Sequence, residues 1–544
     1  INFRGRNIKV AGADRETTII DGDSSGTVVT FSNGEDFTTV LSGFTIQNGY
    51  LYSSDPTDGL NGGGVSISNA SPTLKNLIVK NCTAFYGGGI YIYNSTSLLE
   101  NISVYGNESV SHGAGIYLDY TAATLRNVAS YTNSSGSHAG GIFINNDYQE
   151  NSPTIIGGSF HDNQASYGVG GVFTQNCAPS FYQSNIVNNQ GGWNDNENAG
   201  GLFLFNADVQ LVSCIVSGNS SPQLEFDSTE AQSVESLSIN YSLIENGQDS
   251  IVTNDNGTVT WGSGNIDVDP MFVDTANGNY YLLASSQLIN AGHPDSTDSD
   301  GTVADIGAYP YLNSYSGPTW YITEDGNDST ATGASDDPFR SIQAGINFSS
   351  NTDSVTVAAG TYVENINFRG RNIMVAGTDQ ETTIIDGDNS GSVVTFISEE
   401  DSNAKLTNFT ITNGANHFGG GIIIDGSSPL LEYLIVEENY FGDITVLYQI
   451  DDQNDINNLS EILELDVNVL PVNDPPVIAL IEDQTVNEDE TFTYELSASD
   501  IDGDDLVFSA TDGDSNFYID GNLLTVYPVQ DFNGDIVFDI TVTD

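Results

Sequence analysis

The sequence predicts an all-β protein in which short strands stack as repeated coils, with a β-sandwich at the C-terminal end. A glycine-rich strand recurs at Gly64, Gly89, Gly115, Gly141, Gly171 and Gly201, in steps of 25, 26, 26, 30 and 30 residues. The stretch 1–36 returns at 366–401 with 28 identical residues, which indicates duplication of a module. Residues 471–544 alternate apolar and polar positions between Asp/Gly turns, as antiparallel sandwich strands do.

Each coil contains the glycine-rich strand and further short apolar runs, such as "PTLKNLIVKN" and "SLLENISVYGN". These runs end in Asn or Gly-Asn, which suits a sharp bend with positive φ. One such coil cannot bury its own apolar face. Stacked coils can, with a rise of roughly 4.8 Å per coil set by the hydrogen bonds between strands. A glycine at the corner lets the chain turn without a Cβ clash.

The coil pattern resembles the right-handed parallel β-helix of the pectate-lyase-like kind, with three strands per coil, over residues 1–440. This resemblance implies a fold and says little about activity. Residues 269–311, which include "DIGAY", resemble the closing segment of secreted bacterial β-helix proteins. Residues 325–346 resemble their opening segment, where "FRSIQAGI" implies a helix that caps the first coil.

These boundaries divide the chain into modules. We expect a first β-helix, a linker, a second and shorter β-helix, the tail of a truncated sandwich, and a sandwich that resembles cadherin-like repeats of bacterial surface proteins. The ranges are 1–312, 313–319, 320–440, 441–472 and 473–544. The tail repeats the end of the last module at an offset of 92 residues. We expect the sequence to be a window on a longer tandem array, whose neighbouring modules are its partners.

The composition excludes several classes of partner. Lys and Arg total 11 against 74 Asp and Glu, a net charge of −63. Such a surface repels nucleic acid, anionic lipid and polyanionic substrates, and it attracts divalent cations. A solvated acidic surface with no specific partner is the alternative. Cys82, Cys177 and Cys214 form no disulfide or metal pattern. No apolar stretch is long enough to span a membrane.

Calcium is the cofactor that the sequence predicts. The resemblance to cadherin-like repeats implies a site at the module junction. Its ligands would be Asn473, Asp474, Glu488, Asp500 and Asp502. Carboxylates at alternate positions can converge on a cation that needs six to eight oxygens. The sequence departs from true cadherins, because "NED" replaces Pro-Glu and no "DRE" motif is visible. Acidic turns without an ion are the alternative.

A second calcium candidate lies in "DSTDSDGTVAD", where four aspartates surround Gly301: Asp295, Asp298, Asp300 and Asp305. The run is similar in style to Asp-x-Asp-Gly calcium loops, although its spacing is not that of an EF-hand. A calcium role and a purely structural role are equally favoured here.

Catalysis has weaker support. A lyase needs a base and positive charge, yet the basic residues do not cluster. Arg4 and Arg6 recur as Arg369 and Arg371, which suggests a structural salt bridge. An inverting hydrolase needs paired carboxylates.

Asp119 and Asp147 fall on adjacent coils and could approach one another, but a hydrogen-bonded polar ladder is favoured. His112, His138 and His161 share no fixed offset from the corner glycine, so a metal or catalytic column is a weak idea.

Five aromatic residues follow successive corner glycines by two positions: Tyr91, Tyr117, Phe143, Phe173 and Phe203. They alternate with aliphatic residues, so they should face outward if the aliphatic residues face the core. An exposed stack of rings would form a glycan-binding face. In the reversed register they would be core.

The leading hypothesis is a non-catalytic extracellular or cell-surface bacterial protein. It would be an adhesin or stalk with calcium-stabilised modules that binds a polysaccharide or another surface ligand. The alternative is a secreted polysaccharide-active enzyme, a glycoside hydrolase or lyase, on the β-helix scaffold.

Overall fold

The structure is a computed structural model of the chain. It describes residues 1–51, 61–146, 152–192, 199–228, 235–416, 419–440, 444–448, 463–467, 476–481, 483–500, 505–511 and 516–543. The chain separates into two compact units. The first comprises Ile1–Ile385, Phe396–Thr410 and Ser427–Leu434, and the second comprises Asp386–Thr395, Ile411–Gly426 and Ile435–Asp544.

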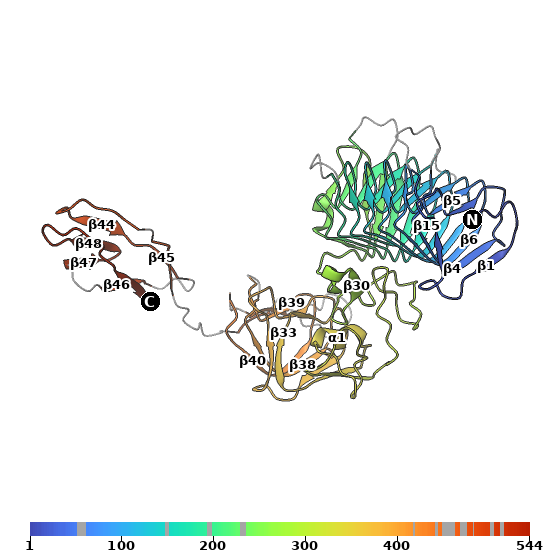
Figure 1. Cartoon of the computed structure of the whole chain (residues 1–544). Helices are drawn as coiled ribbons and strands as arrows, with labels where there is room; N and C mark the ends of the chain where they lie inside the picture. Colours follow the sequence, from blue (N-terminus) through green and yellow to red (C-terminus); the bar gives the residue numbers. More distant parts are fainter. Residues whose placement is uncertain are drawn as a thin grey trace. The chain divides into compact units, whose positions relative to one another are not determined.

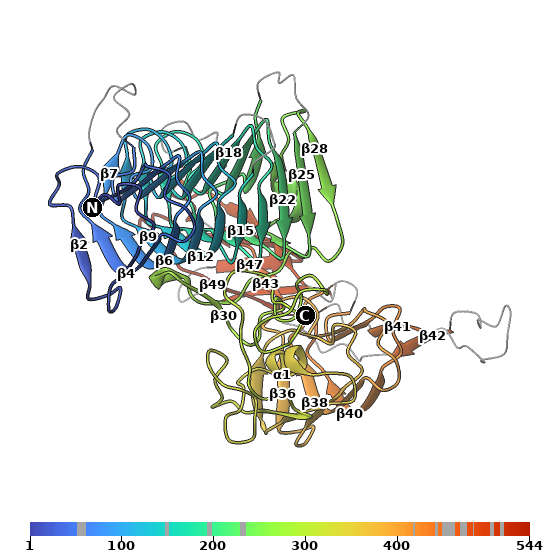
Figure 2. The same ribbon diagram turned by 90° about the vertical axis from the view of Figure 1, so that its right-hand side faces the viewer.

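Parallel strands of the first solenoid stack coil upon coil (Figures 1 and 2). The first sheet contains β3 (Val29–Phe31), β5 (Val65–Ser68), β8 (Ile90–Tyr93), β11 (Ile116–Asp119), β14 (Ile142–Asn145), β18 (Val172–Gln175), β21 (Leu202–Phe205), β24 (Leu224–Phe226) and β27 (Ile251–Val252). The smallest sheet contains β7 (Thr83–Ala84), β10 (Glu108–Ser109), β13 (Ser134–Ser135) and β17 (Gln164–Ala165).

The remaining sheet of this solenoid is the most extensive. It contains β1 (Lys9–Ala11), β2 (Ile19–Asp21), β4 (Val40–Gln47), β6 (Thr73–Lys80), β9 (Leu98–Tyr105), β12 (Thr124–Tyr131), β15 (Thr154–Ile156), β16 (Ser159–His161), β19 (Ser180–Tyr182), β20 (Asn185–Val187), β22 (Asp208–Val212), β23 (Ile215–Ser217), β25 (Ser236–Asn240), β26 (Leu243–Ile244) and β28 (Thr258–Trp261). Three parallel sheets confirm the predicted β-helix.

The register places like residues above one another. Ile116 pairs with Ile90 on one side and with Ile142 on the other, and all three are fully buried. Such aliphatic rows from the three sheets form one continuous core. The predicted corners are also confirmed, because asparagines with positive φ end many strands, as Asn94 does after β8.

A ladder of buried asparagines runs along the inside of one corner: Asn107, Asn133, Asn163, Asn189 and Asn219. The Asn163 side-chain carbonyl accepts hydrogen bonds from the backbone N–H of Asn133 (3.1 Å) and from its Nδ2 (3.0 Å). The same pair of bonds repeats from coil to coil. The close approach of the next coil and the ladder together explain the corner glycines, because a Cβ at Gly171 would lie 2.5 Å from the Gly201 carbonyl oxygen and 2.9 Å from Asn189 Nδ2.

The segment after the first solenoid packs against the edge of its coils. It contains the 3₁₀ helix η3 (Thr275–Asn277) and the hairpin of β29 (Phe272–Asp274) and β30 (Asn279–Leu282), whereas the 3₁₀ helix η2 (Gly247–Ser250) lies within the solenoid, between β26 and β27. Tyr280, Leu288 and Ile306 join Val187 and Ile215 of the solenoid in one buried cluster. The segment therefore closes part of the solenoid surface.

A helix, α1 (Ile342–Phe348), lies where the sequence predicts the capping helix. The backbone N–H groups of Ile342 and Gln343 donate to the Glu364 carboxylate, at 2.7 and 2.9 Å. Asn347 donates to the carbonyls of Ala284 (3.0 Å) and Ser286 (2.8 Å). The helix is thus tied to the closing segment of the preceding module.

The second solenoid continues with further short strands. They are β31 (Thr319–Ile322), β32 (Ser354–Val357), β33 (Gly360–Val363), β34 (Ile366–Asn367), β35 (Met374–Gly377), β36 (Thr383–Asp386), β37 (Val394–Phe396), β38 (Lys405–Thr412), β39 (Ile422–Ile424) and β40 (Leu430–Val436). Parallel pairing of β31 with β32 and of β32 with β35 repeats the coil pattern of the first solenoid.

The C-terminal module is an antiparallel sandwich, as predicted. Its strands are β43 (Val477–Ile478), β44 (Phe492–Glu495), β45 (Ala498–Ser499), β46 (Val507–Thr511), β47 (Asn516–Asp520), β48 (Leu523–Tyr527) and β49 (Asp539–Thr543). Before it, β41 (Ile444–Tyr448) pairs antiparallel with β42 (Leu463–Val467). Within the described residues, no helix is long and apolar enough to cross a membrane.

Candidate functional site

A row of aromatic rings lies on the outer face of the first solenoid. Tyr91, Tyr117, Phe143, Phe173 and Phe203 are register partners on β8, β11, β14, β18 and β21. Successive ring centroids are 5.5, 4.9, 4.6 and 5.1 Å apart. The rings form a cluster of their own, separate from the solenoid core. The alternation along each strand therefore turns these rings outward.

Three members of this aromatic row are nevertheless buried, because a second row of rings lies over them. Tyr117, Phe143 and Phe173 are 7%, 3% and 7% exposed. His112 stacks on Phe143 with the ring centroids 4.8 Å apart, and His138 lies 5.1 Å from Phe173. The alternation of residues along the strands does not predict that an adjacent loop covers these rings.

The row of covering rings ends at the coil in which a glycine takes the place of the covering ring. Tyr86, His112 and His138 each precede a corner glycine by three residues, and Gly168 occupies this position in the next coil. A Cβ built at Gly168 would overlap Nδ1 of His138. With no side chain at Gly168, the ring of Phe203 stays partly exposed beyond the last covering histidine.

The expectation that these histidines share no offset from the corner glycine is wrong for two of them. His112 and His138 do share an offset from the corner glycine, and their rings stack 5.2 Å apart. His161 lies on a different sheet, where it stacks with Tyr131. Burial lowers the pKa of His112 to about 4 and also lowers that of His138. These two rings are therefore uncharged at neutral pH.

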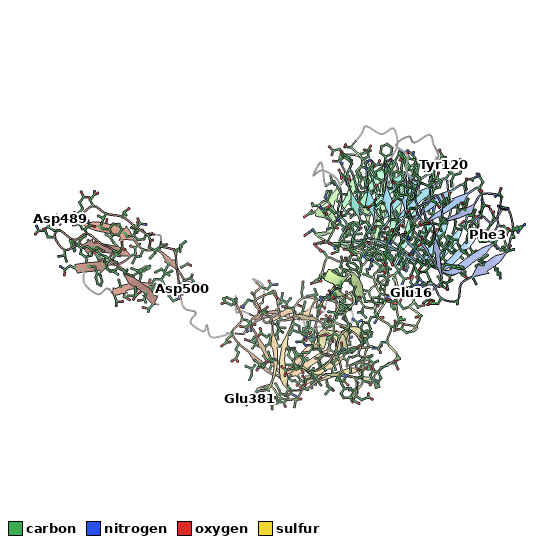
Figure 3. All side chains as sticks on the ribbon, viewed as in Figure 1. Phe3, Glu16, Tyr120, Glu381, Asp489 and Asp500 are labelled. Atoms are coloured by element: carbon green, nitrogen blue, oxygen red, sulfur yellow. The ribbon has the colours of Figure 1, made fainter. Side chains whose placement is uncertain are left out.

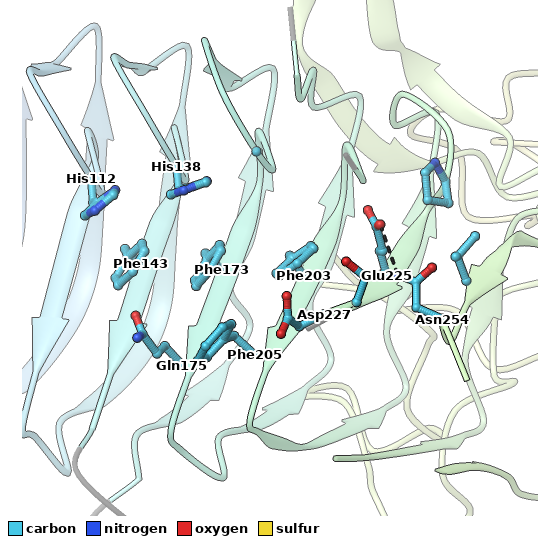
Figure 4. A pocket seen from close by; sticks show the side chains of 14 residues that line it. His112, His138, Phe143, Phe173, Gln175, Phe203, Phe205, Glu225, Asp227 and Asn254 are labelled. Atoms are coloured by element: carbon cyan, nitrogen blue, oxygen red, sulfur yellow. Dashed lines mark hydrogen bonds between the residues drawn. The ribbon is translucent and has the colours of Figure 1, made fainter. Parts of the chain in front are cut away.

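A cavity of about 1030 Å³ opens beside the uncovered end of the aromatic row (Figure 4). It is lined by His112, His138, Phe143, Gly168, Phe173, Gln175, Phe203, Phe205, Pro222, Glu225, Asp227, Ser228, Val252 and Asn254. Its volume is in the range of ligand sites in proteins. Among the described residues that line it, none is Lys or Arg.

Two carboxylates form the far end of this cavity. Glu225 is the register partner of Phe203 and takes the next place in the aromatic row. Its carboxylate accepts hydrogen bonds from Ala199 N (2.9 Å) and Asn254 Nδ2 (3.3 Å). Asp227 follows two residues later, and both residues are less than a tenth exposed.

The glycine repeat does not point to this carboxylate pair, because the coil that carries it lacks the corner glycine. Gln223 takes that place, and its carbonyl accepts the Leu202 N–H as the carbonyls of corner glycines do elsewhere. Counting two residues on from Gln223 gives Glu225. A repeat alignment that tolerated Gln at the corner would have found the position.

A third acidic group lies close to the pair. Glu235 is fully buried, and its carboxylate accepts a hydrogen bond from Asn206 N at 2.6 Å. Burial, with a smaller contribution from the charge of Asp227, raises the pKa of Glu235 to about 7.

Asp119, the first predicted catalytic candidate, lies on β11 between Tyr93 and Asn145 of the neighbouring coils. Its carboxylate accepts hydrogen bonds from Asn145 Nδ2 (2.8 Å) and from the Tyr91 hydroxyl (3.3 Å). Burial raises the pKa of this carboxyl group. Asp147, its predicted partner, lies outside the described residues, so the pairing stays a prediction.

Three aspartates of the closing segment, Asp298, Asp300 and Asp305, accept hydrogen bonds from other protein groups through their carboxylates. Asp298 accepts from Gln183 Nε2 and from Asp305 N, and Asp300 accepts from Thr302 and Asn313.

Asp305 accepts from the backbone N–H groups of Asn290 and Tyr311, each at 2.7 Å. Burial raises its pKa to about 8. The backbone N–H of Asp295 donates to His293. Calcium binding at this loop stays a prediction.

The sandwich contains one group of converging carboxylates. Glu488, Asp489 and Asp531 have ligand atoms within 4.8 Å of one another, and this is the only such group of three or more among the described residues. Asp500 lies at the other end of the sandwich from Asp489 (Figure 3). The other predicted ligands, Asn473, Asp474 and Asp502, lie outside the described residues.

Comparison with known proteins identifies the C-terminal module. Residues 473–544 match the family model of the bacterial Ig domain. Searches of curated proteins and of solved structures found no significant match to the chain. A parallel β-solenoid joined to a bacterial Ig domain fits a surface or stalk protein.

Proposed function

We propose that the protein is a non-catalytic extracellular or cell-surface adhesin or stalk whose first solenoid binds a glycan. The observation that carries this proposal is the row of stacked rings that ends, uncovered, in the cavity beside Phe203. Sugar rings present flat C–H faces, and aromatic side chains supply large apolar surfaces of matching shape. Phe203 and Phe205 are both partly exposed in the cavity wall and offer such a surface to a sugar ring.

A panel of immobilised neutral, amino-sugar and acidic polysaccharides tests this function. The whole chain should be retained by at least one polymer, and the retained polymer should keep its length. If no polymer is retained, the glycan-binding proposal is wrong.

A polysaccharide-active enzyme is the second candidate. The observation in its favour is that two carboxylates line the cavity and that burial raises the pKa of Asp119, which accepts a hydrogen bond from Tyr91 of the aromatic row. A raised carboxyl pKa suits a general acid. If any polymer is shortened, and Asp119→Asn or Asp227→Asn abolishes the shortening, the protein is an enzyme and the non-catalytic proposal fails.

We further propose that calcium stabilises the Ig-like module. The support is the group formed by Glu488, Asp489 and Asp531, whose oxygens are of the kind that calcium prefers. Calcium should raise the temperature at which this module unfolds, and Asp531→Asn should remove that rise. Asp520→Asn, a change at an exposed aspartate of the same module, serves as the control. An unfolding temperature that does not respond to calcium would contradict the proposal.

A further inference from the structure

We propose that the cavity selects a glycan whose sugars carry protonated amines, such as a chain of glucosamine units, over neutral and uronate chains. This inference rests on the proposed glycan-binding function and names the class of ligand for the same site. It follows from the charges and rings that meet at the end of the aromatic row.

The charged side chains that line the cavity are acidic. Glu225 and Asp227 supply two carboxylates, and the described lining contains no Lys or Arg to neutralise them. The two histidines of the lining have lowered pKa values and are uncharged at neutral pH. A uronate chain would therefore meet only like charge, whereas a protonated amine would meet its complement.

The carboxylates are also poorly hydrated. Glu225 and Asp227 are 9% and 8% exposed, so a cation that reaches them does not have to strip away a full hydration shell. The hydrogen bonds that Glu225 accepts from Ala199 and Asn254 hold its carboxylate at the cavity wall. A charge-assisted hydrogen bond from an ammonium group is stronger than one from a neutral hydroxyl.

The rings of the row add to the same preference. Phe203 pairs in register with Glu225, and Phe205 lies two residues further along the same strand (Figure 4). A sugar stacked on Phe203 would place its substituents beside both carboxylates. An ammonium group that approaches a ring face is also attracted by the ring quadrupole. A neutral acetamido group at that place would gain neither interaction.

Calorimetric titration of the whole chain tests the inference. The probes are oligomers of glucosamine, N-acetylglucosamine and galacturonic acid of equal length, at about pH 6, where the amine is protonated. We expect the glucosamine oligomer to bind at least about tenfold more tightly than the N-acetyl form. The galacturonate oligomer should bind least.

The double variant Glu225→Gln/Asp227→Asn should lose this preference, so that the ratio of its affinities for the glucosamine and N-acetyl oligomers falls to about one. Asp227→Asn alone is the second variant, because Glu225 also accepts the Ala199 hydrogen bond. Glu16→Gln/Glu108→Gln removes the same net charge at exposed positions and should keep the preference.

Each outcome separates the two proposals. Equal affinities for the glucosamine and N-acetyl oligomers would overturn the selectivity and leave glycan binding intact. A preference that survives in Glu225→Gln/Asp227→Asn, or that the Glu16→Gln/Glu108→Gln control loses, would overturn it as well. Absence of binding to all three oligomers would refute the selectivity, and the polysaccharide panel then decides whether the protein binds another glycan.

Discussion

Phe203 and Glu225 are register partners on neighbouring coils, so the aromatic row of the first solenoid passes directly into a carboxylate. Phe203 stacks 5.1 Å from Phe173 on one side, and on the other it faces the cavity. It is the last ring of the row and the first beyond the covering histidines.

Phe203→Ala should weaken glycan binding about tenfold, equivalent to about 1.4 kcal/mol, because it removes the ring face nearest the cavity. Titration with the polymer that the wild-type protein retains measures this effect. Phe37→Ala is the matched control, since Phe37 belongs to the same solenoid, is 75% exposed and does not line the cavity. If both variants bind like the wild type, the aromatic row is not the binding face.

Asn163→Ala should destabilise the first solenoid by about 2–4 kcal/mol. The Asn163 side chain accepts two hydrogen bonds from Asn133 and donates to the Ser130 carbonyl (2.8 Å) and to Asn189 Oδ1 (3.0 Å). Its removal takes the acceptor from the buried Asn133 N–H and one partner each from the Asn133 amide group and the Ser130 carbonyl, and an unsatisfied buried group costs about 1–3 kcal/mol. Urea unfolding followed by circular dichroism measures the change.

The control for the ladder is Asn33→Ala, at an exposed position of the same solenoid. A surface change of this kind should alter the stability by no more than about 0.5 kcal/mol. Equal effects of the two substitutions would show that the buried ladder contributes nothing special to the fold.

The sequence predicted the solenoid because its physical cause is periodic. Corner glycines and aliphatic pairs recur in nearly every coil, and the outward direction of Tyr117 and Phe143 followed from their alternation with isoleucines. The bacterial Ig module was equally predictable from its alternating strands.

The cover over the row was harder to predict, because it depends on the loop before each corner. In that loop a single position holds Tyr86, His112, His138 and then Gly168. The carboxylates were missed because Gln223 interrupts the glycine series. Asp305 accepts hydrogen bonds from distant backbone groups, and the spacing of residues in the sequence does not predict such bonds.

His112 makes the stability of the first solenoid depend on pH. Its pKa is lowered to about 4 by burial and by the neighbouring His138, whereas an unfolded chain has a histidine pKa near 6.5. Between these values the unfolded state binds the proton more readily, so stability present above about pH 6.5 is lost as the pH falls toward 4.

His112→Phe keeps a ring over Phe143 and removes the titration. The unfolding temperature of this variant, relative to the wild type, should therefore rise progressively between pH 7 and pH 4. Carboxyl groups with raised pKa values, such as Glu235, have the opposite dependence, but they are common to both proteins and cancel in the difference. A difference that stays constant across this range would contradict the prediction.

Arg369 joins the capping helix of the second solenoid to the closing segment of the first. Its Nη1 donates to the Asn347 side chain (2.8 Å) and to the Ile289 carbonyl (3.1 Å). Burial lowers the pKa of its guanidinium to about 9, so the group remains charged at neutral pH. Its counterpart in the duplicated stretch, Arg4, has the same left-handed backbone conformation but is exposed.

A comparison of the same substitution at Arg369 and at Arg4 isolates the effect of burial. Arg369→Gln should destabilise the junction by about 2–4 kcal/mol, because buried acceptors lose a charged donor, and it should speed proteolysis of the closing segment. Arg4→Gln makes the same chemical change at the same backbone geometry, so it should leave both the unfolding temperature and the cleavage rate nearly unchanged. If both variants are cleaved alike, the guanidinium of Arg369 does not hold the two modules together, and other contacts do so, such as those of Asn347 with Ala284 and Ser286.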